Sequence, residues 1–425
     1  MKQKQAITPF TGYQKIVIFI LAITQFTVIL DFMIMSPLGD MLMKSLSLKP
    51  SAFGIAVSAY AFSAGLSGLL TAGFADKFDR KKLLVFFYTG FILGTIFCGL
   101  AQSYPALLAA RIITGLFGGV IGSISMAIIT DLFALQQRGR VMGFVQMGFG
   151  GSQVLGVPLG LYIANTWGWQ APFLMTAGLA IIIVILILAK LKPVTEHLLV
   201  QHDRTALVHL WHTLTRRDYR IGFAATAVLS IGGFMMMPFG SAFAINNLKI
   251  TYAELPLLFM TSGICSLIIM PVIGRLSDKI SKFKLFTIAT IWLMIICVLY
   301  TNLAATPFWL VLTFNVLMMM GILSRMVPSV ALTSAVPAMA DRGAFMSINS
   351  SLQQIAGGVA AAVAGLIVVQ QTEFSPLKNY DTVGYVVVVV SAISIFLLYQ
   401  VSRIVGGEAV DKPAAPEGVV VTEAI

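Results

Sequence analysis

Long apolar runs dominate this chain and constrain its fold more than any other feature. An apolar run of about 18 residues or more is long enough to cross a bilayer as a helix, and we count twelve such runs. Only 11% of the 425 residues are charged, whereas soluble globular proteins carry about 25%. The sequence therefore predicts an all-α membrane protein with twelve transmembrane helices, at about 16–38, 53–75, 83–101, 105–130, 139–163, 170–191, 221–246, 254–276, 285–303, 307–332, 343–369 and 383–404.

The positive charges indicate how these helices are oriented. Of the 28 Lys and Arg, 22 fall in the two terminal segments and the loops on their side, and the opposite loops hold only Lys44, Lys49, Lys249 and Lys378. Cytoplasmic loops are rich in Lys and Arg, so we expect a multi-pass protein of a cell inner membrane with both termini in the cytoplasm. The net charge of +11 then orients the protein in the lipid bilayer and does not indicate a nucleic-acid partner.

The chain divides into two similar halves. Asp76 in "AGFADKFDRKK" and Asp278 in "GRLSDKISKFK" lie 202 positions apart, and Arg138 in "RGRVMG" and Arg342 in "RGAFMS" lie 204 apart. Parallel halves of this kind are a transporter architecture, with the substrate site between them near the midplane. We expect an N-terminal six-helix bundle (1–192), a cytoplasmic linker (193–220), a C-terminal six-helix bundle (221–404) and a disordered cytoplasmic tail (405–425).

Two opposite charges are predicted at the same depth in the first half. Asp31 and Arg111 each lie about seven residues from the outer end of a helix, hence roughly 10 Å below the surface. A charge inside the bilayer normally faces a cavity or a partner. Asp31 could carry protons, with Arg111 tuning it; it could bind a cationic substrate directly; or the pair could be a static link between helices.

The sequence shows no pattern typical of an enzyme, a metal site or a bound cofactor. Cys98, Cys265 and Cys297 all lie in apolar runs and suggest no disulfide framework. His209 and His212 are three residues apart, but this spacing alone is weak evidence for metal. We expect no enzymatic activity, no metal and no cofactor.

Three segments together resemble the major facilitator superfamily, in particular its group of drug:proton antiporters and arabinose-efflux-like permeases. They are the loop "AGFADKFDRKK", the helix "AARIITGLFGG" and the glycine-rich "GFGGSQVLGVPLGLYIANTWGW", and the resemblance extends to about residue 404. It implies two pseudo-symmetric bundles that rock around a central site, energised by a proton gradient. It also implies that Arg111, with Gly115 four residues later, faces a cavity near the first helix.

The resemblance further implies a latch on the cytoplasmic side. Asp76 would face the positive N-terminus of the eleventh helix, with Lys77 and Asp131 nearby, and Asp278 would be its mirror partner at the fifth helix. The remaining residues expected in this latch are Arg80, Arg138 and Arg342. A loop that carries charge only for topology is the simpler alternative, but it does not explain Asp76.

A hinge is expected in the fifth helix. Gly156 and Gly160 allow close helix packing, and Pro158 frees a backbone carbonyl and bends the helix. In the resembling family this pattern accompanies export rather than uptake.

The substrate site is expected between the bundles. The run "GGFMMMPFG" supplies adaptable apolar side chains, and polar residues on the fifth and eleventh helices could add hydrogen bonds. We expect no charge at depth in the second half: the repeat offset places Asn315 at the position equivalent to Arg111, and Arg325 falls near the inner end of its helix. The expected substrate-binding residues are Asp31, Arg111, Gln146, Gln153, Phe234, Met235, Phe239, Asn315, Asn349 and Gln353.

These features predict a monomeric secondary transporter that exports a small, partly apolar compound in exchange for protons. A sugar or metabolite exporter, or an uptake symporter, with Asp31 only structural is the main alternative. A receptor or scaffold that transports nothing is a weaker one, because no extramembrane domain is predicted.

Overall fold

The protein is a bundle of long helices. The computed structural model describes residues 9–71, 77–195, 198, 212–338 and 341–411, and only the backbone of 135, 136, 278 and 406–411. Across these residues twelve helical spans are long and apolar enough to cross a membrane. They contain no β-strand, only an isolated bridge between Val369 and Lys378. The predicted all-α membrane fold is confirmed.

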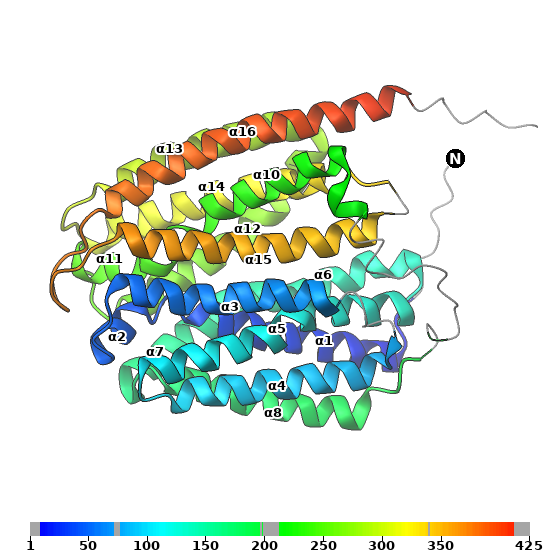
Figure 1. Cartoon of the computed structure of the whole chain (residues 1–425), viewed down its shortest axis with the longest axis horizontal. Coiled ribbons are helices and arrows are strands. Elements are labelled where there is room, and N and C mark those ends of the chain that lie inside the picture. The colour runs from blue at the N-terminus through cyan, green and yellow to red at the C-terminus, as the bar shows by residue number, and fades with distance from the viewer. Residues whose placement is uncertain (1–8, 72–76, 196–197, 199–211, 339–340, 412–425) are drawn as a thin grey trace, which may run out of the picture.

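The two halves of the chain form two bundles that lie one above the other in Figure 1. The N-terminal bundle contains α1 (Gly12–Ile34), α2 (Gly39–Ser45), α3 (Pro50–Thr71), α4 (Arg80–Leu100), α5 (Tyr104–Leu132), α6 (Leu135–Gly151), the π-helix η2 (Ser152–Gly156), α7 (Val157–Trp167) and α8 (Ala171–Lys190). The C-terminal bundle contains α10 (Arg217–Phe234), the 3₁₀ turn η4 (Met237–Phe239), α11 (Gly240–Asn246), α12 (Leu255–Lys279), α13 (Lys282–Thr301), α14 (Phe308–Thr333), α15 (Arg342–Ile367) and α16 (Tyr380–Asp411).

Two helix boundaries differ from those expected. Helix α10 begins at Arg217, inside the segment predicted as linker, and Asp218 lies favourably in its first turn. Helix α16 continues to Asp411, so the prediction of a disordered tail is wrong for 405–411. Residues 412–425 lie outside the described part of the chain.

The first and seventh spans are broken at equivalent positions, which the apolar runs did not reveal. Pro37 follows the end of α1, and Pro238 follows the end of α10, 201 residues later. Proline lacks the N–H that would continue a helix, so a short helix, α2 or α11, follows each break. The two breaks contact each other: Ser36 donates a hydrogen bond to the Met237 carbonyl, and Ser241 donates one to the Ser36 carbonyl.

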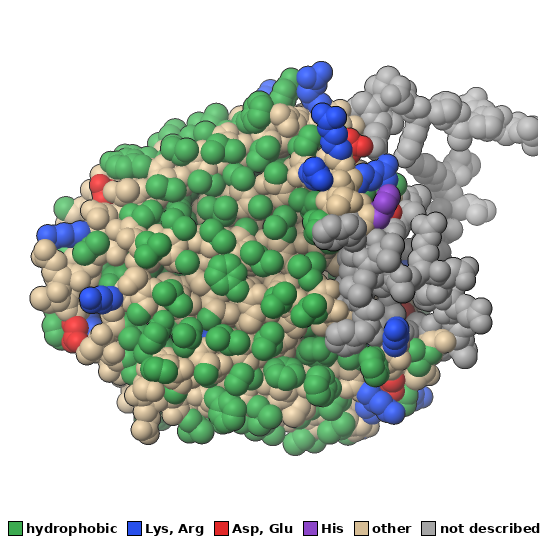
Figure 2. Space-filling model, in the orientation of Figure 1, with side chains coloured by type: hydrophobic (Ala, Val, Ile, Leu, Met, Phe, Trp, Pro, Cys, Tyr) green, Lys and Arg blue, Asp and Glu red, His purple; other side chains and the backbone are tan. Residues whose placement is uncertain are grey.

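We call the side of the molecule with α2 and α11 the distal side, and the opposite side, where α1 begins and α16 ends, the terminus side. Both are recognisable in Figure 1, with α2 and α11 at the left and the final turns of α16 at the right. In Figure 2 hydrophobic side chains cover the middle of the visible face, and most charged side chains lie toward these two ends. This distribution is the one expected of a membrane-embedded surface.

The buried core shows that the bundles are joined more tightly on the distal side. One buried cluster contains Ile34 and Phe53 of the N-terminal bundle together with Phe239 and Phe243 of the C-terminal bundle. Two further buried clusters, deeper toward the terminus side, each draw their buried members from a single bundle. The apolar core is therefore shared on the distal side and divided on the terminus side.

Helices α3 and α15 form the main seam between the bundles and lie side by side in Figure 1. A Cβ atom at Gly54 would lie 2.7 Å from the Ala361 carbonyl oxygen, so only glycine allows this approach. Ser58 donates a 2.7 Å hydrogen bond to the Gly358 carbonyl across the same seam. Small residues thus bring the two backbones together, as is common between membrane helices.

Candidate functional site

Asp31 and Arg111 form a buried ion pair. Arg111 Nη1 lies 2.9 Å from Asp31 Oδ2, and Thr95 donates a 3.1 Å hydrogen bond to Asp31 Oδ1. The side chains of Asp31 and Arg111 are 0% and 1% exposed. Asp31 lies on α1, Thr95 on α4 and Arg111 on α5, so these three residues join three helices of the N-terminal bundle.

The guanidinium of Arg111 also contacts an aromatic ring. Its central carbon lies 4.5 Å from the ring centre of Tyr60 on α3, a cation–π arrangement. Its Nε atom is buried without a hydrogen-bond partner among the described atoms. Arg111 therefore contacts one carboxylate and one ring, and its Nε–H donor has no partner among the described atoms.

Glycines on α5 create the space for this contact. Gly115 lies one turn after Arg111, and a Cβ atom there would lie 2.4 Å from the carbonyl oxygen of Tyr60 and 2.1 Å from the hydroxyl of Ser63. Because this glycine lets α5 approach α3, the Tyr60 ring can reach the guanidinium. The Arg-x-x-x-Gly spacing in the sequence thus has a direct packing role.

The pair lines neither of the two cavities described below, although the family resemblance implies that Arg111 faces one. Tyr60 packs on the ring of Phe32 at 5.3 Å, and Phe32 packs on Phe234 of the C-terminal bundle at 6.1 Å. These three rings form a row, which we call the aromatic row, between the ion pair and the bundle interface. Water would reach Asp31 only in a conformation in which the surrounding helices or this row have moved.

A π-helical segment, Ser152–Gly156, lies in the fifth span where the hinge was expected. The N–H of Val157 donates to the Ser152 carbonyl, five residues back, just before Pro158. Gly156 and Gly160 face α1: a Cβ atom on them would lie 2.8 Å from Leu30 and 2.7 Å from Ile34, respectively. This glycine face therefore packs against the part of α1 that carries Asp31.

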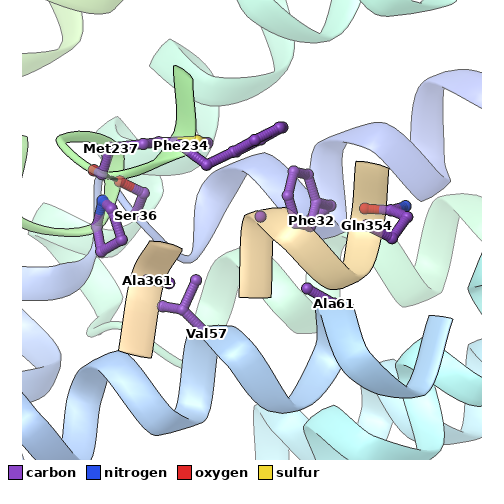
Figure 3. A pocket seen from close by; sticks show the side chains of 10 residues that line it. Phe32, Ser36, Val57, Ala61, Phe234, Met237, Gln354 and Ala361 are labelled. Atoms are coloured by element: carbon purple, nitrogen blue, oxygen red, sulfur yellow. Dashed lines mark hydrogen bonds between the residues drawn. The ribbon is translucent and has the colours of Figure 1, made fainter. Parts of the chain in front are cut away.

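A small chamber lies between the bundles beyond the aromatic row (Figure 3). Its volume is about 20 Å³, roughly the space for one water molecule. Figure 3 shows Phe234, Met237 and Ser36 toward the upper left and Phe32 and Gln354 toward the right. The lining residues are Phe32, Ser36, Val57, Ala61, Phe234, Met237, Pro238, Gln354, Gly357 and Ala361, none of which is ionisable. We call this space the central chamber.

A larger cavity of about 170 Å³ lies toward the terminus side, between α3, α5 and α15. Serines dominate its polar lining, and Arg80 stands at one edge. The lining residues are Ala64, Gly68, Thr71, Arg80, Gly119, Val120, Ser123, Ile124, Ala127, Ser347, Ser350, Ser351 and Gln354. We call it the serine cavity.

The predicted substrate-binding residues of the seventh span separate in the structure. Phe234 lines the central chamber, whereas Met235 and Phe239 are buried in the core, Phe239 against Phe53 at 5.8 Å. The expectation that Met235 and Phe239 face the site is therefore wrong here. The chain leaves the α-helix after Phe234 and enters the 3₁₀ turn η4, where Met237 lines the chamber instead.

The polar residues predicted to bind substrate also lie in different places. Gln146 and Gln353 are exposed and line neither cavity. Asn315 accepts a hydrogen bond from Ser262 on the neighbouring α12, away from the chamber. Gln153 and Asn349 each hold a buried carbonyl oxygen without a partner among the described atoms.

Several lining residues were not predicted from the sequence. Ser36, Phe32 and the serines of α15 carry no recognisable motif, and nothing in the sequence distinguishes Gln354 from its neighbour Gln353. Consecutive residues on a helix point about 100° apart. Only the packing of α15 on α3 decides that Gln354, rather than Gln353, faces inward.

The second bundle does hold a charge at depth, contrary to the prediction. Arg325 is 2% exposed and lies eight residues before the end of α14, at Thr333. Its Nη1 lies 3.3 Å from the Ser391 hydroxyl, and its Nη2 lies near the glycine pair Gly232–Gly233. The glycines leave room for the guanidinium. The apolar run in the sequence does not indicate a charge at this depth.

The predicted latch can be followed only in part. Asp76 and the side chain of Asp278 lie outside the described residues. Arg80 pairs with Asp131 at 3.3 Å, but this pair joins α4 to α5 within one bundle. Lys77 and Arg342 are exposed, and Arg138 donates hydrogen bonds to the carbonyls of Thr130 and Phe133 that end α5.

The distal side carries a polar network that joins the bundles. Asp40 is 1% exposed and accepts hydrogen bonds from Asn246 and from Tyr252, both in the opposite bundle. Lys44 lies 2.8 Å from Asp40 and also reaches Asn246 and Tyr252, at 3.3 and 3.2 Å. Burial raises the pKa of Tyr252 above its usual value, as do its hydrogen bond to Asp40 and the negative charge there. We call these four residues the distal lock.

Comparisons with known proteins agree with this architecture. The family model described as Major Facilitator Superfamily matches residues 21–240 and 222–422. The chain is 25% identical over 381 residues to the uncharacterized MFS-type transporter YbcL of Bacillus subtilis, covering 89% of this chain and 95% of that one.

Two relatives have names that refer to cargo. The multidrug resistance protein fnx1 of Schizosaccharomyces pombe is 37% identical over 127 residues, which are 29% of this chain and 24% of that protein. A probable sugar efflux transporter of Helicobacter pylori is 25% identical over 268 residues, or 63% of this chain and 66% of that one.

A solved structure supports the fold. The crystal structure of a bacterial homologue of the human lysosomal transporter Spinster, inward-facing and unoccupied, matches with a TM-score of 0.76 at 13% identity, covering 96% of this chain and 100% of that one. The twelve spans, the paired bundles and the family match lead to one conclusion: this chain belongs to the Major Facilitator Superfamily and is a membrane transporter rather than an enzyme.

Proposed function

We propose that the protein exports a small, partly apolar compound in exchange for protons, and that Asp31 carries the proton. The observation that carries this proposal is the ion pair of Asp31 with Arg111, buried to 0% and 1% exposure. A buried pair of charges costs several kcal/mol per ion in desolvation, and removing the charge of one partner leaves the other uncompensated. Protonation of Asp31 would therefore destabilise this arrangement and favour another.

The sequence of states follows from which side is closed. The distal lock and the shared core seal the distal side here, while the serine cavity lies toward the terminus side. With both termini in the cytoplasm of a cell inner membrane, this is the cytoplasm-facing state after proton release, ready for cargo. After the bundles rock, Asp31 takes a proton from the outside and the cargo leaves.

The name of one relative and the lining of the central chamber support the proposal that the cargo is partly apolar. The name of fnx1 refers to multidrug resistance, and the central chamber is lined by two phenylalanines and a methionine. Such side chains accept varied apolar surfaces. We propose that the protein works as a monomer, because each chain contains both bundles and the space between them.

A second candidate is export of a sugar or another hydroxylated metabolite. The serine cavity and the name of the Helicobacter relative favour it. Competition separates the two: neutral sugars should not displace an apolar probe from the purified protein if the first proposal is correct.

The decisive experiment uses proteoliposomes that contain a pH-sensitive dye and are given ethidium as the transported probe. Ethidium movement should drive proton movement in the opposite direction. Asp31→Asn should abolish this coupling and gradient-driven accumulation, yet retain ethidium counterflow, which needs no net proton transfer. The control is Asp218→Asn, an exposed acid at the start of α10. Unchanged coupling in Asp31→Asn, or proton movement in the same direction as ethidium, would overturn the proposal.

A further inference from the structure

The two cavities between the bundles meet at a single residue. Gln354 lines both the central chamber and the serine cavity, and no other residue is shared by the two linings. Its side-chain amide forms no hydrogen bond with another described residue. An amide offers two donors and an acceptor, so this group is available to a molecule that passes from one space to the other.

The polarity of the path changes at this residue. On α15, Ser347, Ser350 and Ser351 line the serine cavity before Gln354, whereas Gly357 and Ala361 line the central chamber after it. A molecule moving along α15 therefore leaves a hydroxyl-rich space and enters an apolar one.

The facing helix α3 continues smoothly along both spaces. Its residues Val57, Ala61, Ala64 and Gly68 recur at the three- and four-residue spacing of one helix face and have small or apolar side chains. These four side chains offer no hydrogen bond, whereas Gln354 of α15 presents a polar group to both spaces.

The central chamber is suited to rings, and no ionisable side chain lines it to pair with a charged group. Phe32 and Phe234 meet edge-to-face at 6.1 Å, and none of the residues that line the chamber is ionisable. Its volume of about 20 Å³ means that one of these rings must move to admit cargo. Phe32 packs on Tyr60, and Tyr60 contacts Arg111. A movement of Phe32 would therefore alter the contacts of the ion pair.

We propose that Gln354 is the residue that recognises the polar group of the cargo, and that the cargo is a flat aromatic compound carrying an amine or hydroxyl group. The ring occupies the central chamber between Phe32 and Phe234, and the amine or hydroxyl bonds the Gln354 amide. This proposal rests on the proposed transport function, because it assigns the cargo of that same site.

Two probes test the hydrogen bond separately from the ring. Ethidium has aromatic amino groups, whereas tetraphenylphosphonium has rings but no hydrogen-bonding group. Binding to the purified full-length protein is measured by fluorescence and by calorimetry. Loss of one hydrogen bond is worth about 0.5–1.5 kcal/mol, or about 3- to 10-fold in Kd.

Gln354→Leu should weaken ethidium binding by about 3- to 10-fold and leave tetraphenylphosphonium binding within twofold. Gln353→Leu is the matched control, because it makes the same change at the neighbouring exposed position, and it should leave both unchanged. Unchanged ethidium binding in Gln354→Leu, or an equal loss of both probes, would overturn the assignment. Failure of both probes to bind the parent protein would overturn the cargo class.

A labelling experiment tests the same contact and remains informative if Gln354→Leu fails to fold. In a Gln354→Cys protein that elutes as a monodisperse peak, ethidium should slow labelling by a water-soluble maleimide, whereas Gln353→Cys should show no such protection. Equal protection at both positions would contradict the proposal. Neither measurement requires a proton gradient, so a failure of proton coupling and a failure of this assignment are distinguishable.

Discussion

Asn246 of the C-terminal bundle donates a hydrogen bond to Asp40 of the N-terminal bundle, and Asp40 is almost fully buried there. The two residues belong to α11 and α2, the short helices that follow the equivalent breaks in the first and seventh spans. Separation of the bundles on the distal side must break this bond. The pair therefore stabilises the distal-closed state selectively.

We expect Asn246→Ala to open the distal side. A hydrogen bond to a charged group is worth about 1.5–3 kcal/mol, which corresponds to a shift of about 10- to 150-fold toward the open state. Spin labels can be attached at the exposed positions Lys49 and Lys378, one in each bundle. Double electron–electron resonance should show a longer distance between the two labels in Asn246→Ala than in the parent. Asn247→Ala is the control, since Asn247 bonds only Leu377 within its own bundle. Identical distance distributions in the parent and Asn246→Ala would contradict a role for the lock.

The distal lock should be insensitive to pH through the physiological range. Burial and Asp40 raise the pKa of Tyr252, so its hydroxyl remains a donor beyond the ordinary tyrosine value of about 10. For a group whose pKa is raised on folding, the stabilisation is complete below the unfolded value and is lost as pH rises through the folded one. The spin-label distances should therefore stay constant from about pH 6 to 9. An increase of the spin-label distances between about pH 6 and 9 in the parent protein, but not in Tyr252→Phe, would show that Tyr252 loses its proton within that range and would contradict this prediction.

Removing one member of the Asp31–Arg111 pair should cost more stability than removing both. Arg111→Gln leaves a buried carboxylate without its counter-charge, a loss of about 3–5 kcal/mol by comparison with other buried pairs. Asp31→Asn combined with Arg111→Gln replaces the ions by two amides and should recover most of that loss. Thermal unfolding in detergent of the parent, both single variants and the double variant measures the coupling. Additive losses would mean that the two residues do not stabilise one another.

Gly115→Ala should damage the site without touching a charge. The added Cβ atom would lie 2.1 Å from the Ser63 hydroxyl and 2.4 Å from the Tyr60 carbonyl oxygen, so α3 and α5 must separate. We expect a loss of about 1–3 kcal/mol, as for other overpacked sites, together with loss of proton coupling. Gly178→Ala on α8 is the control: nothing lies within 4 Å of its Cβ position, and alanine favours helix by about 1 kcal/mol. Equal melting temperatures for the two variants would refute the packing argument.

Much of the fold could be predicted because membrane insertion depends on local sequence. Backbone groups in lipid must be satisfied within a helix, so run length alone located the twelve spans. The glycine and proline of the fifth span predicted an irregularity there, and the π-segment Ser152–Gly156 lies at that place. The breaks after Ile34 and Phe234 were missed, although a proline follows each, because apolar residues continue past them.

The contact between Asp31 and Arg111 was also accessible from the sequence. Both residues are costly in lipid and lie at the same depth, so each is the natural partner of the other. Their complete enclosure was not accessible, because it depends on Tyr60, Thr95 and Phe32 from three helices. No spacing along the chain relates these residues.

By itself, then, the sequence determined the number of spans, the repeat, the family and the buried pair, because hydrophobic length and the cost of a charge in lipid are properties of single segments. Only the tertiary structure decided which side chain of each helix faces the space between the bundles. It turned Gln354 inward and Gln353 outward, and it buried Met235 and Phe239 in the core. The physical reason is that a rotation of one helix by one residue changes its inward face, and that rotation is set by the small residues of other helices packing against it.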